Sequence, residues 1–218
     1  MWNRRASIVI LISGNGSNLQ AIIDAISNKQ INGYIACVIS NNESAYGLER
    51  AKAANIKNII VDHKNFPSRE GFDKALLKKI EPFSPDIIVL AGFMRILSQT
   101  FIEKFEGKII NIHPSLLPKY PGLNTHDQAI KAKDKIHGVT VHYVNEHLDS
   151  GAICAQSILN IKTSNPVELE HEVHMLEYKI YPEVISWIAR GDMRINNNKV
   201  TFLNKDIENE VIIFEDLR

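Results

Sequence analysis

The feature that most constrains this chain is a regular alternation of short apolar runs with segments of helical periodicity. The apolar runs are Ser7–Ser13, Ile35–Ser40, Asn58–Val61, Ile87–Ala91 and Lys108–Ile112. The helical segments lie near residues 17–28, 46–54, 69–80 and 97–105. Repetition of strand and helix predicts a parallel sheet with right-handed crossovers. We therefore expect an α/β, Rossmann-like fold of three layers with a mostly parallel sheet.

The second half of the chain has a different pattern. Apolar and polar residues alternate over Gly138–Tyr143, and Ala152–Leu159 is a further candidate strand, so strand pairing is expected to become antiparallel there. Residues 165–191 begin with a capping asparagine and a proline and continue with an apolar stripe, which predicts one long helix. The last segments, Asn198–Leu203 and Glu210–Phe214, are expected to form a peripheral hairpin or extension.

Composition argues against several classes of function. The chain has 25 basic and 25 acidic residues, so no broad electrostatic footprint for nucleic acid or for a membrane surface is expected. Cys37 and Cys154 lie in apolar runs without metal-ligand spacing, which indicates buried, reduced thiols in a cytoplasmic protein. The first apolar run, Ala6–Ile12, is too short for a membrane span of about 20 residues. A monomer and a homodimer both remain open.

One strand end carries residues suited to chemistry. Asn111 and His113 occupy alternate positions of an apolar run that stops at Pro114, so both side chains leave the same face of the strand. An amide and an imidazole placed in this way can polarise a carbonyl oxygen and move a proton, as acyl transfer requires. For this motif alone, a histidine in a satisfied structural hydrogen-bond network is the alternative.

A glycine-containing loop follows the first run. Gly14 and Gly16 allow the backbone to approach a ligand, and the helix that follows offers unpaired N–H groups to a phosphate. Leu19 replaces the third glycine of a dinucleotide fingerprint, and a structural tight turn is the alternative interpretation. Because ligands bind at the carboxyl ends of parallel strands, this loop and His113 are expected at one edge of the sheet.

A third candidate is the turn at residues 145–151, Asn-Glu-His-Leu-Asp-Ser-Gly. If Asp149 faces His113, its carboxylate favours the charged imidazole, which suits a proton shuttle near neutral pH. An ordinary Asx turn is the alternative for this segment. The histidines at 137, 142 and 147 recur every five residues, a spacing that places no pair on one face of a strand or helix.

These segments together resemble the folate-dependent formyltransferase family, and within it the phosphoribosylglycinamide formyltransferases. The similar motifs are Leu11–Gln20, Leu90–Leu97 and Asn111–Gly122. Asn-x-His-Pro-Ser-Leu-Leu-Pro is common to folate-dependent formyltransferases and hydrolases, whereas Gly-Asn-Gly-Ser-Asn in a short chain points to the glycinamide ribonucleotide enzymes. The resemblance implies one formyltransferase domain over residues 1–191, with residues 192–218 as an extension packed on the same domain.

The resemblance also implies a reaction. A formyl group passes from 10-formyltetrahydrofolate, the cosubstrate, to the amine of 5-phosphoribosylglycinamide in purine synthesis, without a metal, a nucleoside triphosphate or an acyl-enzyme. His113 would act as acid and base, Asn111 would donate to the oxyanion, and Asp149 would keep His113 charged and relay the proton. No nucleic acid or membrane partner is implied.

Binding roles carry over to matching positions of this sequence. Those for phosphoribosylglycinamide are Gly16, Ser17, Asn18, His174 and Glu177. Those for the folate are Arg69, Met94, Arg95, Ile96, Leu97, Asn111, Asn145, Glu146, His147, Leu148 and Asp149. The sequence departs from many relatives at Asn124, where they carry histidine.

Three other functions remain as alternatives. A hydrolase acting on the same folate would share Asn111, His113 and Asp149, but a regulatory domain usually precedes its catalytic domain. A methionyl-tRNA formyltransferase would normally add a basic RNA-binding domain at the C-terminus. A noncatalytic nucleotide-binding module would keep the loop at Gly14 without needing the other three residues.

Overall fold

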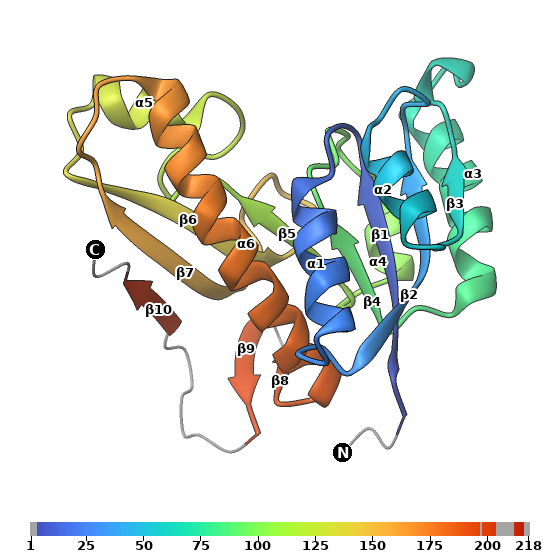
Figure 1. Ribbon diagram of the computed structural model, residues 1–218. Coiled ribbons are helices and arrows are strands. Elements are labelled where there is room, and N and C mark those ends of the chain that lie inside the picture. The colour runs from blue at the N-terminus through green and yellow to red at the C-terminus, as the bar shows by residue number, and fades with distance from the viewer. Residues whose placement is uncertain (1–3, 197, 204–211, 216–218) are drawn as a thin grey trace.

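The computed structural model describes residues 4–196, 198–203 and 212–215, and a sheet of eight strands is its central layer (Figure 1). In spatial order the strands are β10 (Ile212–Glu215), β7 (Ile153–Asn160), β6 (Ile136–Tyr143), β5 (Ile109–His113), β4 (Ile87–Leu90), β1 (Ala6–Ile12), β2 (Gly33–Ser40) and β3 (Asn58–Ile60). β6 pairs antiparallel with both β5 and β7, and the other neighbouring strands are parallel. The predicted fold class is therefore confirmed.

Helices cover both faces of this sheet. Their bounds are α1 (Ser17–Ser27), α2 (Gly47–Ala53), α3 (Arg69–Ile80), α4 (Gln99–Lys104), α5 (Thr125–Lys131) and α6 (Pro166–Arg190), with short 3-10 turns at His63–Asn65 and Glu81–Phe83. Alternate residues of β1 enter two separate apolar clusters: Ile8 and Ile10 pack with α1, α2 and α6, whereas Val9 and Leu11 pack with α3 and α4. This alternation produces three layers, and Figure 1 shows α1 and α6 side by side on one face.

The long helix α6 begins and ends where its sequence predicts. The Asn165 side chain accepts a hydrogen bond from the Val167 N–H at 3.0 Å, and Gly191 ends the helix with a left-handed φ of 76°. The shorter α5 was not predicted, because seven residues carry too little periodicity. It follows Asn124, whose φ of 59° lies in the left-handed region that asparagine tolerates.

The C-terminal segments do not pair with one another. Lys199–Phe202 forms β9, which pairs antiparallel with β8 (Met193–Asn196) in a separate two-stranded sheet. The strand β10 instead adds to the main sheet, parallel to β7. The sequence left a hairpin or an extension open for these segments, and the two segments make different pairings: β9 with β8, and β10 with the edge of the main sheet. Glu210 and Val211, which belong to the second predicted segment, lie outside the described residues.

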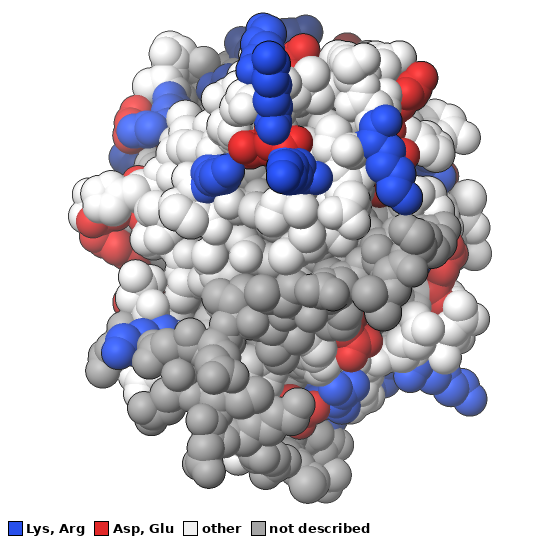
Figure 2. Space-filling model, turned by 90° about the vertical axis from the view of Figure 1, so that its left-hand side faces the viewer, with Lys and Arg blue, Asp and Glu red and all other residues white. Residues whose placement is uncertain are grey.

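The two thiols are buried and the visible surface carries charges of both signs, as the composition predicts. Cys37 and Cys154 are buried and unpaired with each other. Figure 2 shows the face that lies on the left in Figure 1, where basic and acidic side chains of the described residues lie close together in several places among uncharged ones. Within the described ranges, no helix combines the length and the apolar composition that crossing a membrane requires.

A single buried hydroxyl ties α6 to the centre of the sheet. The Tyr181 side chain is fully buried, and its Oη lies 3.0 Å from the Leu90 carbonyl oxygen and 3.2 Å from the Ile110 carbonyl oxygen. Burial raises the pKa of Tyr181 well above its ordinary value, so the phenol remains a neutral donor. The contact fixes α6 to the last residue of β4 and the second residue of β5.

Replacement of Tyr181 by phenylalanine tests this contact. We expect Tyr181→Phe to lower the free energy of unfolding by about 1 kcal/mol, because a buried hydrogen bond is lost. Urea denaturation followed by circular dichroism measures the change. The control is Tyr34→Phe, whose ring is 43% exposed and which should change stability by less than about 0.5 kcal/mol. Equal effects of the two substitutions would contradict a fastening role for the Tyr181 hydroxyl.

Candidate active site

The candidate active site is built where β5 meets β6. In the antiparallel register Asn111 lies opposite His142, so the two side chains share one face of the sheet, and Asn111 Nδ2 is 3.3 Å from His142 Nε2. His113 projects from the same face, two residues further along β5. An amide and two imidazoles therefore lie together at this junction.

Asp149 joins this cluster from the loop between β6 and β7. Its Oδ2 lies 3.3 Å from His113 Nδ1 and accepts a hydrogen bond from the Gly122 N–H at 2.8 Å. The His113 and Asp149 side chains are only 6% and 9% exposed, so their interaction is weakly screened by water. Gly151 closes the loop against β6: a Cβ at this position would meet the Tyr143 carbonyl oxygen at 1.8 Å, which only glycine avoids. The structure thus brings Asn111, His113 and Asp149 together.

Both ring nitrogens of His113 face oxygen atoms. Nε2 lies 2.8 Å from the carbonyl oxygen of Tyr120, and Nδ1 faces Asp149 on the other side of the ring. A neutral imidazole donates to one of these oxygens, whereas an imidazolium donates to both. The arrangement holds the ring in a single orientation between the Tyr120 carbonyl oxygen and the Asp149 carboxylate.

His142 is a member of the cluster that the sequence analysis missed. Its Nδ1 donates to the Tyr143 carbonyl oxygen at 2.9 Å, and burial lowers its pKa, so the ring is neutral with a lone pair on Nε2. That lone pair accepts from the Asn111 amide and fixes its orientation. Histidine spacing along one strand carries no information on this cross-strand contact. The available signal was the placement of His142 in an alternating strand, in the part of the chain where pairing was expected to become antiparallel.

The predicted phosphate loop lies at the start of α1. Gly16 has a φ of 73°, and a Cβ there would lie 2.7 Å from the Gly47 backbone, so this position requires glycine. Ser17 opens the helix, which directs backbone N–H groups outward. The buried Asn18 donates from Nδ2 to Glu177 Oε2 at 2.7 Å, while its Oδ1 has no hydrogen-bond partner. An acceptor of this kind is available to a ligand.

Glu177 connects this loop to α6 and to His174. Its Oε2 is 2.9 Å from His174 Nδ1, and this hydrogen bond raises the pKa of the imidazole against the opposing effect of burial. Asn18, His174 and Glu177 therefore form one network although 159 positions separate Asn18 from Glu177. The network places an imidazole and a carboxyl group beside the start of α1.

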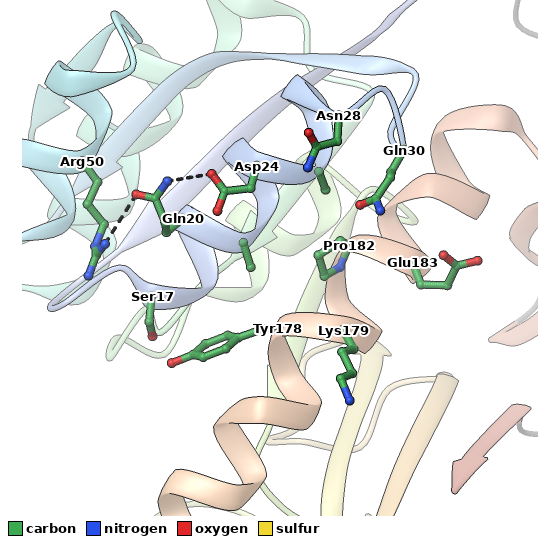
Figure 3. A pocket seen from close by; sticks show the side chains of 12 residues that line it. Ser17, Gln20, Asp24, Asn28, Gln30, Arg50, Tyr178, Lys179, Pro182 and Glu183 are labelled. Atoms are coloured by element: carbon green, nitrogen blue, oxygen red, sulfur yellow. Dashed lines mark hydrogen bonds between the residues drawn. The ribbon is translucent and has the colours of Figure 1, made fainter. Parts of the chain in front are cut away.

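A cavity of about 690 Å³ lies between α1 and α6 (Figure 3). It extends from Ser17 and Tyr178 to Asn28 and Gln30, and its wall carries charges of both signs. None of Asn111, His113 and Asp149 lines it. The cavity is therefore separate from the β5–β6 cluster and shares Ser17 with the residues predicted to bind phosphoribosylglycinamide.

The predicted folate residues lie in three separate segments. Arg69 is the first residue of α3, and its Nε is 3.5 Å from its neighbour Glu70. Met94 and Ile96 are 67% and 60% exposed, which leaves apolar surface for a ligand, while Leu97 is buried. In the loop of residues 145–149, the Asn145 side chain accepts from the His147 N–H at 3.1 Å. Among the described residues, no hydrogen bond or ion pair joins Arg69 to residues 94–97.

Metal ligation finds no support in the described part of the chain. Among those residues, no three His, Cys, Asp or Glu side chains are grouped so that they could hold a metal ion. The His126 and His137 rings do approach each other, with Nδ1 of one 3.2 Å from Nε2 of the other. Burial lowers the pKa of both and brings that of His137 to about 4.

Known proteins have similar sequences and structures. Residues 6–185 match the formyl transferase family. The chain is 47% identical over 193 residues to a phosphoribosylglycinamide formyltransferase of Escherichia coli strain K12, covering 88% of the chain and 91% of that protein. A Haemophilus influenzae enzyme of the same name is 49% identical over 192 residues, with the same two coverages. A solved phosphoribosylglycinamide formyltransferase of Coxiella burnetii, in complex with CHES, superposes with a TM-score of 0.91 at 48% identity, covering 97% of this chain and 100% of that chain.

Titration of His174 tests the network around Glu177. We expect its pKa to lie above the ordinary value of about 6.5 and to fall in Glu177→Gln, because the carboxylate that stabilises the charged ring is lost. A raised pKa stabilises the folded state at low pH, and this contribution is lost as the pH rises through the raised value. NMR of the ring carbon signals measures the titration. Glu170→Gln is the control, since its contact with His174 is longer at 3.7 Å; an equal or larger effect there would contradict the assignment.

Proposed function

Because the chain belongs to the formyl transferase family, we propose that it transfers the formyl group of 10-formyltetrahydrofolate to the amine of 5-phosphoribosylglycinamide. The products are the N-formyl compound and tetrahydrofolate, in a step of purine biosynthesis. The observation that carries the proposal is the cluster of Asn111, His113 and Asp149 within a chain similar to named formyltransferases over nearly its whole length. The buried free thiols suit a reducing, cytoplasmic compartment.

The network at the start of α1 suits the phosphoribosylglycinamide. Backbone N–H groups at Gly16 and Ser17 are oriented to receive a phosphate, and the positive end of the helix dipole adds to the attraction. The unpartnered Oδ1 of Asn18 can accept from a hydroxyl or an amine of the substrate. The raised pKa of His174 favours its charged form next to an anion, and Glu177 can accept from the amine.

The folate would occupy the side of the site formed by α3, residues 94–97 and residues 145–149. The Arg69 guanidinium is exposed and can pair with the carboxylates of the folate tail. Exposed apolar side chains of Met94, Ile96 and Leu148 offer surface to its ring system. The role of the remaining residues of these segments, Arg95, Asn145, Glu146, His147 and Asp149, follows from their position in the same stretches of chain.

The reaction needs a stabilised oxyanion and one proton transfer. When the amine attacks the formyl carbon, the carbonyl oxygen gains negative charge, and the Asn111 amide can donate to it. His113 can donate as well once Nε2 exchanges the Tyr120 carbonyl oxygen for the substrate oxygen. The bond from the formyl carbon to the folate nitrogen then breaks. The proton released by the amine passes to that nitrogen through His113 and Asp149, so atoms and charge balance.

Formyl transfer by the purified protein tests the function. Tetrahydrofolate and the formylated acceptor should appear in equal amounts, and only when 5-phosphoribosylglycinamide is present. His113→Ala and Asp149→Asn should each lower turnover about a hundredfold or more, because oxyanion and proton-transfer contributions are lost. Both products can be followed by chromatography.

The matched control is His171→Ala, which removes an exposed histidine of α6 and should keep turnover within about twofold of wild type. Circular dichroism verifies that each variant folds. Folate deformylation without acceptor would instead identify a hydrolase. Wild-type turnover in a folded His113→Ala or Asp149→Asn variant would remove the proposed mechanism.

Separate KM values test which part of the site binds each substrate. Ser17→Ala and Asn18→Ala should raise the KM for 5-phosphoribosylglycinamide more than the KM for the folate, because these residues lie at the proposed phosphate site. Steady-state kinetics with each substrate varied in turn measures this. Asp24→Ala, further along α1, should leave both values unchanged. A selective rise in the folate KM would reverse the assignment.

A further inference from the structure

The segment that joins β4 to α4 has no regular secondary structure but is fastened near both of its ends. Its residues 92–98 include the proposed folate contacts at 94–97. Near the start, the Met94 N–H donates to Ser13 Oγ at 2.7 Å. At the end, the Ser98 N–H donates to Asp73 Oδ2. The segment lacks a strand or helix ladder of its own, so these side-chain contacts determine its path.

Asp73 carries a carboxyl group that is buried among apolar side chains. It lies on α3, one turn after Arg69, and is 1% exposed. Its chain neighbour Phe72 and nearby Leu76 belong to an apolar cluster that also contains Phe93 and Leu97 of the fastened segment. Burial raises the pKa of Asp73, whereas its hydrogen bonds with Ser98 oppose that change. A carboxyl group is costly to bury in such a cluster unless it is hydrogen-bonded. Among the described residues, Asp73 Oδ2 accepts from the Ser98 N–H, whereas Asp73 Oδ1 has no hydrogen-bond partner, so the bond to Ser98 is the contact that offsets the cost of burial.

What Asp73 holds is the junction between the segment and α4. Ser98 is the N-cap of α4, and its Oγ accepts from the Phe101 N–H at 3.4 Å. Because Asp73 binds the same serine, it fixes the end of the segment and the start of the helix together. It also links this end to the helix that begins with Arg69.

Ser13 fastens the segment near its other end, at Met94. Its Oγ donates to Asn41 Oδ1 at 2.6 Å and thereby keeps a lone pair directed at the Met94 N–H. The Ser13 N–H in turn donates to the Gly92 carbonyl oxygen at 3.2 Å. Ser13 immediately precedes the Gly14 loop, so the two proposed substrate sides share this contact.

We propose that Asp73 and Ser13 are positioning residues that hold Met94–Leu97 in the shape that binds the folate. This inference rests on the proposed function and assigns to each residue a role that acts through the segment rather than through contact with the substrate. Their hydrogen bonds leave Met94 and Ile96 directed to solvent while Phe93 and Leu97 stay buried. Loss of the Ser13 contact frees the segment near Met94, and loss of the Asp73 contact frees it at Ser98.

The test compares KM values for the two substrates in Asp73→Ala. We expect the KM for 10-formyltetrahydrofolate to rise roughly tenfold, with the KM for 5-phosphoribosylglycinamide within about twofold and kcat within about threefold of wild type. Asp73→Asn retains an oxygen that accepts from the Ser98 N–H and should restore most of the folate KM. Ser13→Ala should raise the folate KM as well, and it serves as the second variant if Asp73→Ala does not fold.

The matched control is Leu76→Ala, which removes a fully buried side chain from the same helix and the same apolar cluster. It should destabilise the protein without changing the folate KM, because its side chain makes no hydrogen bond to the segment. Equal folate KM effects of Asp73→Ala and Leu76→Ala would overturn the inference by showing general loosening. A wild-type folate KM in the folded Asp73→Ala or Ser13→Ala variant would also overturn it.

Direct binding separates failure of the inference from failure of the proposed function. If the wild-type protein transfers no formyl group, the proposed function fails, and calorimetric titration with tetrahydrofolate then tests the segment alone. A roughly tenfold weaker Kd in Asp73→Ala than in wild type supports the positioning role. Equal Kd values, or no tetrahydrofolate binding by wild type, overturn it.

Discussion

The pairing of β5 with two neighbours of opposite direction is the constraint on which the site depends. Parallel pairing with β4 places the end of β5 on the same sheet edge as the loop after β1. Antiparallel pairing with β6 sets His142 opposite Asn111. The turn between β6 and β7 can then deliver Asp149 to His113. A shift of β6 by one residue would turn His142 to the other face and remove its contact with Asn111.

Burial strengthens the electrostatic interactions of the polar cluster and also raises the cost of any polar atom left without a hydrogen bond. In a weakly screened site electrostatic interactions are stronger than in water, but every unpaired polar atom there is costly. Backbone groups supply these hydrogen-bond partners: the Gly122 N–H donates to Asp149, and the Tyr120 carbonyl oxygen lies at hydrogen-bond distance from His113. The loop of residues 114–123 therefore supports the chemistry although none of its side chains was assigned a role. Substrate binding must replace at least one of these contacts.

Local patterns predicted most of the fold. Each strand and helix expected in the first half occurs within about three residues of its predicted bounds, and α6 begins and ends at its capping residues. Elements with little periodicity, such as α5 and β8, escaped the analysis because short segments carry a weak signal. The partner of the last strand could not be predicted, because strand order depends on contacts between distant parts of the chain.

In the site, too, local patterns could be predicted, whereas contacts between distant parts of the chain could not. Alternation along one strand was enough to place Asn111 beside His113 on one face, whereas the contacts of His142, the Asn18–Glu177 bond and the Asp73–Ser98 bond join separate elements. Such contacts follow from register and helix packing, which a single sequence does not encode in its local pattern. The family resemblance supplied His174 and Glu177, and the structure supplied the physical connection between them and Asn18.

The central claim is that Asn111 and His113 act on one transition state, and a single-turnover double-mutant cycle tests it most directly. The rate of formyl transfer from saturating substrates would be measured in Asn111→Ala, His113→Ala and the double variant. Residues that act as a unit have strongly non-additive effects. The account predicts that the double variant loses far less rate than the product of the two single losses. Losses that multiply fully would show that the two side chains work independently and would contradict it.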